Sequence, residues 1–144
     1  VGFSSTQGQN NWYYKEWTGS SYNNMTWDSG AGRWKGSYTY CLVMANRQHP
    51  ETNDSARMWS APYSGTIRIE GNPKKEDSNG DGIIVRIVKN STTIWGPYTV
   101  TNTTGTTHDF TTSVSPGDSI YFRVNQNGNG AYDTTVWDPL ITYQ

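Results

Sequence analysis

The stretch that decides the fold is Asp81-Gly-Ile-Ile-Val-Arg-Ile-Val-Lys-Asn-Ser-Thr-Thr-Ile-Trp95. In an extended chain Ile83, Val85 and Ile87 fall on one face, and the residues between them fall on the other. β-Branched residues dominate the run and a polar Asn-Ser pair interrupts it, so the pattern predicts a strand, a tight turn and a returning strand. Because a lone hairpin is not stable in water, its apolar face must pack against other strands.

Alternating runs on both sides of this hairpin supply such strands. Residues 66–70 place two isoleucines on one face, and residues 119–124 place Ile120, Phe122 and Val124 on one face. Further short strands are expected at 12–17, 38–44, 56–60, 98–101, 109–114 and 134–143, with a loop at 18–36 and a turn at Gly96-Pro97. No run of ten or more residues has a helical period. The prediction is an all-β fold, an antiparallel β-sandwich of the jelly-roll type.

Length and composition indicate one domain with an unusual supply of rings. The chain has 144 residues, of which 33% are hydrophobic and 14% aromatic, with seven Trp and ten Tyr. At this length a single domain can bury a sizeable core. Trp and Tyr suit surfaces that are half apolar and half wet, so we expect some of these rings to be exposed for binding.

Charge and cysteine content exclude several classes of protein. The formal net charge is −1 and no run of Lys and Arg occurs, which disfavours nucleic acid as a partner. No apolar stretch approaches a membrane span and no signal peptide is recognisable. A start at Val1 rather than Met suggests that residues 1–144 are one module of a larger, processed protein. Cys41 has no second cysteine to pair with, and we expect a buried thiol.

The ring-dense stretch from residue 12 to residue 35 is the predicted binding region. Pyranose rings stack their C–H faces on Trp and Tyr, and their hydroxyls need polar side chains beside the rings. The predicted ligand-binding residues are Trp12, Tyr14, Trp17, Trp27, Arg33, Trp34 and Lys35, with Tyr132 in the 127–132 loop on a second wall. The alternative is that these rings cap an open end of the sandwich. Trp59 and Trp95 lie within strands and are expected in the core.

Three arginines form a second candidate site. Arg68, Arg86 and Arg123 each lie mid-strand on the face opposite the core. If two of the strands are neighbours, their guanidinium groups form a cationic stripe suited to the carboxylates of an anionic polysaccharide. The alternative is that they pair with acidic neighbours such as Glu70 on a solvated sheet face.

A calcium loop is the third candidate. Asp77, Asn79 and Asp81 alternate as oxygen donors and Gly82 stands at the sixth position, but Val88 replaces the glutamate that a complete EF-hand requires. Asx-Gly turns are also common in hairpins. No cofactor is therefore required, and a structural calcium ion is an option. His49 and His108 lack zinc-ligand spacing and are expected to be satisfied surface or loop histidines.

An ordered set of motifs resembles a known family. The motifs are Arg57-Met-Trp59, Ala61-Pro-Tyr-Ser-Gly-Thr66, the run 80–90, Gly117-Asp-Ser-Ile-Tyr-Phe-Arg-Val124 and Asp133-Thr-Thr-Val-Trp-Asp-Pro139. They are similar to the jelly-roll carbohydrate-binding modules of bacterial polysaccharide-degrading enzymes, with xanthan-binding modules as the nearest group. The resemblance implies a non-catalytic, secreted, extracellular and monomeric module that holds a linked glycoside hydrolase or lyase on its polysaccharide. Modules of this kind often carry one structural calcium, for which Asp138 is a candidate.

Two other function classes stay open at this stage. An adhesion or spacer domain would need a contiguous apolar patch rather than polar-flanked rings. A small glycoside hydrolase or lyase would need two carboxylates across the scissile bond. Most of the twelve acidic residues fall in turns, only Glu16 and Glu70 lie in predicted strands, and no closely spaced glutamate pair appears. We therefore expect a binding module that is not an enzyme.

Overall fold

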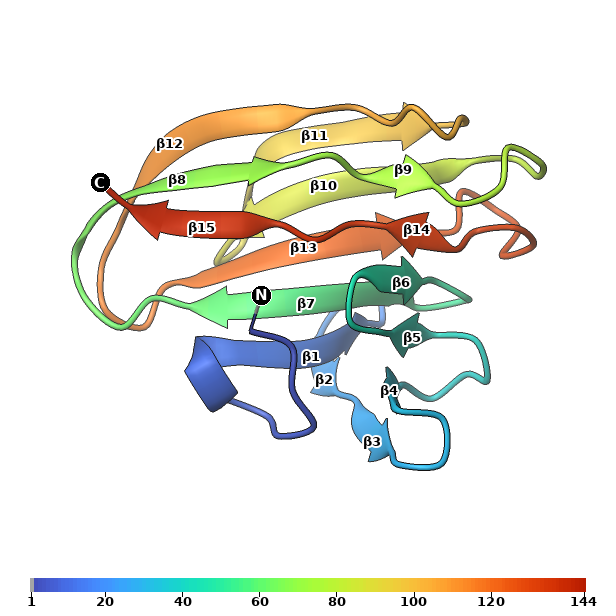
Figure 1. Ribbon diagram of the computed structural model, residues 1–144, viewed down its shortest axis with the longest axis horizontal. Coiled ribbons are helices and arrows are strands. Elements are labelled where there is room, and N and C mark those ends of the chain that lie inside the picture. Colours follow the sequence, from blue (N-terminus) through green and yellow to red (C-terminus); the bar gives the residue numbers. More distant parts are fainter. Residues whose placement is uncertain (1) are drawn as a thin grey trace.

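The computed structural model describes residues 2–144 and shows two layers of antiparallel strands (Figure 1). One layer is a six-stranded sheet, called sheet A here. Its strands, in spatial order, are β11 (Thr92–Val100), β10 (Ile83–Lys89), β13 (Ser119–Asn125), β7 (Asp54–Ser60), β1 (Trp12–Trp17) and β2 (Tyr22–Asn24). A short 3-10 turn, η1 (Gln9–Asn11), precedes β1.

The second layer combines a three-stranded sheet C and a six-stranded sheet B. Sheet C has the order β12 (His108–Val114), β8 (Gly65–Gly71) and β15 (Leu140–Tyr143). Sheet B has the order β3 (Thr26–Asp28), β4 (Arg33–Lys35), β5 (Leu42–Val43), β6 (Arg47–His49), β14 (Thr135–Val136) and β9 (Lys74–Lys75). In Figure 1 the chain runs on from β8 into β9 and from β14 into β15, so the two sheets form one continuous layer.

The pairing confirms the predicted fold class. β13 lies between β10 and β7, and β8 lies between β12 and β15, so neighbours in space are far apart in sequence. Every strand pair is antiparallel across the part of the chain that the structure describes. The chain is an all-β antiparallel sandwich of the jelly-roll type. No helix among residues 2–144 is long and apolar enough to cross a membrane.

The β10–β11 hairpin supplies the centre of the core. Ile83, Val85 and Ile87 are fully buried, and Phe122 of β13 lies opposite Ile87 in register. Each such side chain contributes about 1.5–3 kcal/mol by its burial. Trp137 fills the space between the layers and meets the Phe122 ring edge-on, with centroids 5.5 Å apart. Trp59 and Cys41 are buried, as predicted.

Four predicted element boundaries are wrong. The expected loop 18–36 contains β2, β3 and β4, because Trp34 is buried and its backbone must then pair with β5. The expected strand 38–44 shrinks to β5. The expected turn at 96–97 lies inside β11, which does not end there. The pairing of β11 with β10 is irregular in this region, with shifts in register. The expected strand 134–143 is divided into β14 and β15.

A buried arginine fastens sheet A to sheet B. Arg57 in β7 donates hydrogen bonds to the carbonyls of Met44, Ala45 and Arg47 and to Gln48 Oε1, over 2.9–3.2 Å. Its side chain faces inward, and burial lowers its pKa to about 10. Four hydrogen bonds to fixed acceptors hold the β5–β6 hairpin against β7.

His108 lies in the core rather than in a surface loop, which corrects the expectation for this histidine. Its Nε2 accepts a hydrogen bond from Trp137 Nε1 at 3.0 Å, and its Nδ1 lies 3.3 Å from the Ile69 carbonyl. The imidazole is therefore neutral, with the proton on Nδ1, and burial lowers its pKa.

Candidate functional site

A pocket of about 510 Å³ opens at one end of the sandwich, and we call it the end pocket. Its lining comes from the β13–β14 loop, the chain before β5 and the end of β6 with the β6–β7 loop. These loops lie at the right of Figure 1. Its volume falls within the range of small-molecule sites. The lining residues are Tyr40, His49, Glu51, Thr52, Gln126, Gly128, Asn129, Gly130, Ala131 and Tyr132.

Two tyrosines from different loops expose their rings at this pocket. Tyr40 is 58% exposed and Tyr132 is 56% exposed. The backbone of Tyr40 is held on both sides, because its N–H donates to Glu51 Oε2 at 2.8 Å and its carbonyl lies 2.8 Å from His49 Nδ1. Burial lowers the pKa of His49, so the ring is neutral at pH 7 and donates from Nδ1 to that carbonyl.

The loop that carries Tyr132 is fastened by a set of side-chain contacts. Asn127 Nδ2 donates to the Asp81 carbonyl at 2.8 Å, and the Asn129 N–H donates to Asp81 Oδ2 at 3.0 Å. The Ala131 N–H donates to Asn129 Oδ1 at 2.8 Å. Tyr132 itself has a φ of 62°, which is uncommon for a residue with a side chain. These contacts order the backbone of the loop that carries the exposed Tyr132 ring.

Asp133, which directly follows Tyr132 in the chain, forms a buried ion pair with Lys75. Lys75 Nζ is 3.7 Å from Asp133 Oδ1, and both side chains are fully buried. Among residues 2–144, neither carboxylate oxygen of Asp133 has a hydrogen-bond partner. Burial raises the pKa of Asp133 to about 7, while the Lys75 ammonium acts in the opposite direction. The ammonium also donates to the Asn79 carbonyl at 2.7 Å, which ties the 77–81 loop to the same point.

The predicted calcium ligands do not converge on one point. Asp77 Oδ1 accepts hydrogen bonds from the backbone and the side chain of Asn79, at 2.8 and 2.7 Å, while Asp81 faces the 127–129 loop. Lys75 already supplies a positive charge at the Asn79 carbonyl. Across the described chain, no group of three or more His, Cys, Asp or Glu side chains is arranged to hold a metal ion. The 77–81 loop therefore does not direct these three side chains at one cation. A structural calcium elsewhere, for which Asp138 is a candidate, stays a prediction.

Three of the six predicted ligand-binding rings lie in the core instead of the end pocket. Tyr14 and Trp34 stack on each other with centroids 4.9 Å apart, and Trp34 Nε1 donates to the Ser4 carbonyl at 2.9 Å. Trp12 is buried against Phe122. These three rings have no free face for a ligand, because β1 and β4 turn them inward. Of the predicted ligand-binding residues, only Tyr132 lines the end pocket.

The other predicted residues of this region are spread over the surface around β3 and β4. Trp27 is half-buried and meets Trp34 edge-on at 5.4 Å. Arg33 Nε is 4.0 Å from Asp28 Oδ2, and Lys35 Nζ donates to the Gly36 carbonyl at 3.3 Å. Arg33 and Lys35 contact their own hairpin and its flanking turn, and Trp27 also packs against Phe3. None of the three lines the end pocket with Tyr132.

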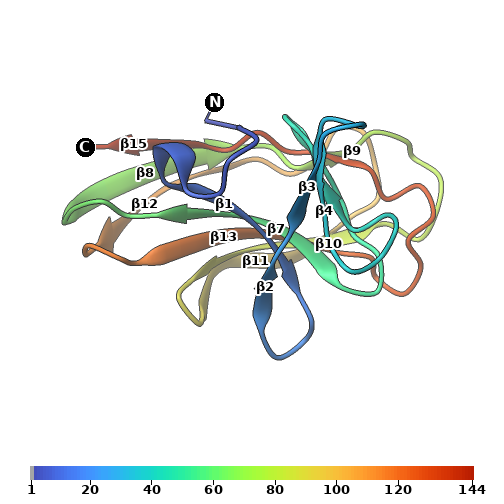
Figure 2. The ribbon, with the colours of Figure 1, turned by 90° about the horizontal axis from the view of Figure 1, so that it is seen from below.

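Trp17 lies in a second concavity, on the outer face of sheet A. This groove has a volume of about 370 Å³ and lies between the β1–β2 turn and the β10–β11 turn, both of which project from the same side of the sandwich in Figure 2. The Arg123 guanidinium stacks over the Trp17 ring at 4.6 Å. Tyr22 and Tyr121 stack on each other beside it, with centroids 3.8 Å apart.

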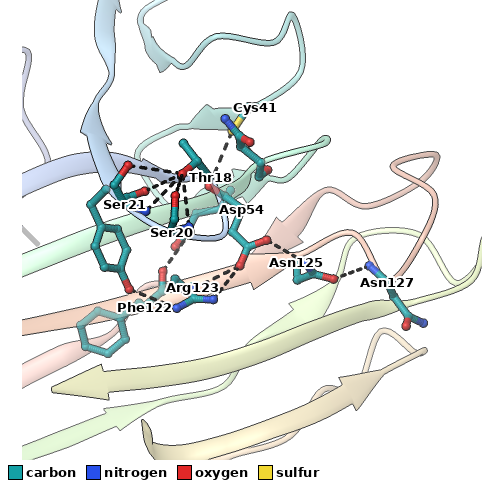
Figure 3. Close-up of polar contacts among 12 residues, drawn as sticks. Thr18, Ser20, Ser21, Cys41, Asp54, Phe122, Arg123, Asn125 and Asn127 are labelled. Atoms are coloured by element: carbon teal, nitrogen blue, oxygen red, sulfur yellow. Dashed lines mark hydrogen bonds and ion pairs between the residues drawn. The ribbon is translucent and has the colours of Figure 1, made fainter. Parts of the chain in front are cut away.

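Arg123 is anchored to a buried carboxylate. Its Nε and Nη2 donate to Asp54 Oδ2 at 3.2 and 3.1 Å, and its Nη1 donates to the Tyr22 hydroxyl at 3.2 Å. Asn125 Nδ2 donates to the other Asp54 oxygen at 2.7 Å, as Figure 3 shows. Burial is the main cause of a raised Asp54 pKa, and these donors act against it.

The predicted cationic stripe exists in part. Arg86 of β10 lies directly opposite Arg123 of β13 on one face of sheet A. Arg68 lies in the other layer and pairs with Asp109 at 2.6 Å and with Glu70 at 3.1 Å. The alternative of pairing with acidic neighbours therefore holds for Arg68 and also for Arg123, which pairs with Asp54. Arg86 and Arg123 meet the condition that two of the strands are neighbours.

Sequence reasoning missed Tyr40, His49 and Glu51 as lining residues of the end pocket. The alternation around residue 41 favours a strand from 38 to 44, which places Tyr40 on a sheet. In the structure Cys41 donates its N–H to the Tyr38 carbonyl, so residues 38–41 form a turn that presents the Tyr40 ring. The run His49-Pro-Glu-Thr52 was available as a loop signal, since proline after histidine breaks a strand.

Comparisons with known proteins give a structural likeness to a carbohydrate-binding module. A scan against protein-family models finds no match, and a search of curated proteins finds none. Among solved structures, the chain is similar to a family 35 carbohydrate-binding module from Clostridium thermocellum, with 13% sequence identity and a TM-score of 0.40. The similarity covers 78% of this chain and 87% of that chain. The function proposed below rests on the geometry of the end pocket.

Proposed function

We propose that this chain is a non-catalytic module that binds polysaccharide at the end pocket. The observation that carries the proposal is the pair Tyr40 and Tyr132, two exposed rings from separate loops that line one pocket. Exposed tyrosine rings offer apolar faces to the C–H patches of a sugar. The amides of Gln126 and Asn129 lie in the same lining and suit sugar hydroxyls.

Catalysis is a weaker reading of this site. Glycoside hydrolysis needs two carboxylates, about 5–10 Å apart, on either side of the bond that breaks. Among the lining residues of the end pocket, Glu51 is the only carboxylate, and it accepts a hydrogen bond from the Tyr40 backbone. The pocket therefore has the residues to hold a sugar and lacks a second acid to cleave one.

The finer form of the proposal follows from the family resemblance described above. It is a secreted, monomeric module of a bacterial protein that targets a linked glycoside hydrolase or lyase to its substrate. The polysaccharide is neutral or anionic, and xanthan is a candidate for the anionic case. The arginines of sheet A support an anionic ligand and are taken up in the next subsection.

Affinity electrophoresis of the isolated chain tests the proposal. The gels contain neutral glucans, mannans, xylan, xanthan or alginate, each with and without a calcium chelator. We expect retardation by at least one polymer. Tyr40→Ala and Tyr132→Ala should each weaken it by about 1 kcal/mol or more, which is about fivefold in affinity. Loss of retardation with the chelator would establish that calcium takes part.

Tyr63→Ala is the matched control, because Tyr63 is also 58% exposed and lies outside the end pocket in the β7–β8 connection. Its ring stacks on Tyr143. Equal losses from all three substitutions would refute the end pocket as the site. No retardation by any polymer would favour an adhesion or spacer domain, and release of reducing ends by the chain alone would favour an enzyme.

A further inference from the structure

Three cations lie in one row across the outer face of sheet A. The register pairs Lys15 of β1 with Ala56 of β7, Ala56 with Arg123 of β13, and Arg123 with Arg86 of β10. Lys15, Arg123 and Arg86 therefore point to the same side of the sheet, and the two arginines are direct cross-strand neighbours. Ser20 and Ser21 of the β1–β2 turn line the same groove as Arg123.

The charges of this row are not balanced by the residues around it. Like charges directly opposite each other on neighbouring strands destabilise a sheet. Asp54 forms a salt bridge with Arg123. The charge of Arg86 also lowers the pKa of Asp54, so the two arginines share one carboxylate. Within the described part of the chain, Arg86 Nε is buried and has no hydrogen-bond partner. A buried donor without a partner is costly. An anionic ligand at the half-buried Arg86 side chain would offset the positive charge of the row.

The surroundings of the row have the chemistry of a sugar site. Arg123 is held in place by Asp54, by the Tyr22 hydroxyl and by the Trp17 ring, so its position does not have to be organised by a ligand. The adjoining groove is lined by the aromatic residues Trp17, Tyr22 and Tyr121 and by hydroxyl and amide groups of the two turns. Rings beside a guanidinium fork match a sugar that carries a carboxylate.

We infer that the groove and the adjoining Arg86 and Arg123 form a second saccharide site, which binds the carboxylate of an acidic sugar residue. The inference rests on the proposed function only in that the ligand is a saccharide. The end pocket takes no part in it. A carboxylate is planar and accepts two parallel hydrogen bonds from one guanidinium. Arg86 is half-buried and forms no salt bridge among residues 2–144.

Isothermal titration calorimetry on the full chain tests the inference, with oligogalacturonate, oligomannuronate and glucuronate oligomers as probes and their carboxyl-reduced forms as neutral counterparts. Arg86→Gln should weaken binding of the best carboxylated probe about tenfold or more, since a hydrogen bond to a charged group is lost. It should leave the carboxyl-reduced form unchanged. Arg68→Gln, which removes the same charge from the other layer, should leave both unchanged.

A second measurement holds even if Arg86→Gln does not fold. In the nitrogen-15 spectrum of the wild-type chain, galacturonate should shift the Trp17 indole signal, whereas galactose should not. This readout also separates the two proposals, because Tyr132→Ala should weaken binding at the end pocket and preserve the Trp17 shift.

Three results would overturn the inference. One is the absence of both calorimetric binding and a Trp17 shift with every carboxylated probe. Another is equal weakening by Arg86→Gln and Arg68→Gln. The third is equal binding of sulfated dextran, which would show a general response to anions rather than recognition of a carboxylate.

Discussion

Removal of the Glu16 carboxylate should destabilise the whole sandwich, because this buried group satisfies several donors at once. Its two oxygens each lie 3.0 Å from the Ser37 backbone N–H, and they also accept from Ser37 Oγ at 2.9 Å and from Asn53 Nδ2 at 2.8 Å. Glu16 lies in β1, whereas Ser37 and Asn53 lie in the connections before β5 and after β6. The carboxylate thereby links sheet A to the turn that presents Tyr40.

The magnitude follows from these contacts. A hydrogen bond to a charged group contributes about 1.5–3 kcal/mol, and a buried donor left without a partner costs about 1–3 kcal/mol. The effects are not additive, so we expect Glu16→Ala to lower the free energy of unfolding by about 3–5 kcal/mol. Glu16→Gln keeps one acceptor oxygen and should cost about 1–2 kcal/mol. The first value is a large part of the typical stability of about 5–15 kcal/mol for a domain.

Urea unfolding followed by tryptophan fluorescence measures these changes. Glu70→Ala is the matched control, because Glu70 is partly exposed and pairs with Arg68 on a sheet surface, where an ion pair contributes about 1 kcal/mol or less. A Glu16→Ala variant within about 0.5 kcal/mol of the wild type would refute the reasoning, as would a Glu70→Ala variant with an equal loss.

Three further predictions concern buried groups. Burial raises the pKa of the Cys41 thiol to about 12, so a thiol reagent at pH 8 should label the native chain only as it unfolds, and rapid labelling would contradict this. Burial lowers the pKa of His108, so its contribution to stability is complete above about pH 6.5 and is lost as the pH falls through the folded-state value. His108→Gln should therefore lower the urea midpoint of unfolding less at pH 5 than at pH 7.5. An equal decrease at the two pH values would contradict this prediction. Lys75→Met leaves buried Asp133 without its cation and should lower the free energy of unfolding by about 3–5 kcal/mol. The double variant Lys75→Met with Asp133→Leu should recover much of this loss, because no unpaired charge stays buried.

The parts of the fold that follow from short-range patterns were predictable. Period-two alternation identified the buried faces of β10 and β13, where Ile83, Val85, Ile87 and Phe122 are all buried. Turn residues placed the hairpin at 90–91. Alternation in a half-buried strand reports burial directly, so one face of each of these strands could be assigned without knowledge of its partners.

The candidate site was less predictable because it depends on pairings between distant segments. Rings in the Gly- and Ser-rich stretch 18–36 suggested exposure, yet Trp34 is buried because β4 pairs with β5 and its ring stacks on Tyr14. Local composition does not reveal such a partner. Similarly, nothing near Tyr40 in the sequence indicates that the 126–132 loop lies beside it. The alignment of Arg86 with Arg123 was stated only as a condition, since strand order follows from the completed fold.

The hydrogen bonds that order the Tyr132 loop affect how tightly the end pocket can bind a ligand. A mobile loop loses conformational entropy when it closes on a sugar, and each ordered residue takes about 1–2 kcal/mol from the affinity. Here the hydrogen bonds from Asn127 and Asn129 to Asp81 order the loop beforehand, with Tyr132 already at a φ of 62°. The loop therefore loses this conformational entropy when the chain folds and not when the ligand binds. Weak stacking on a few rings can then give measurable binding, and association need not wait for the loop to rearrange.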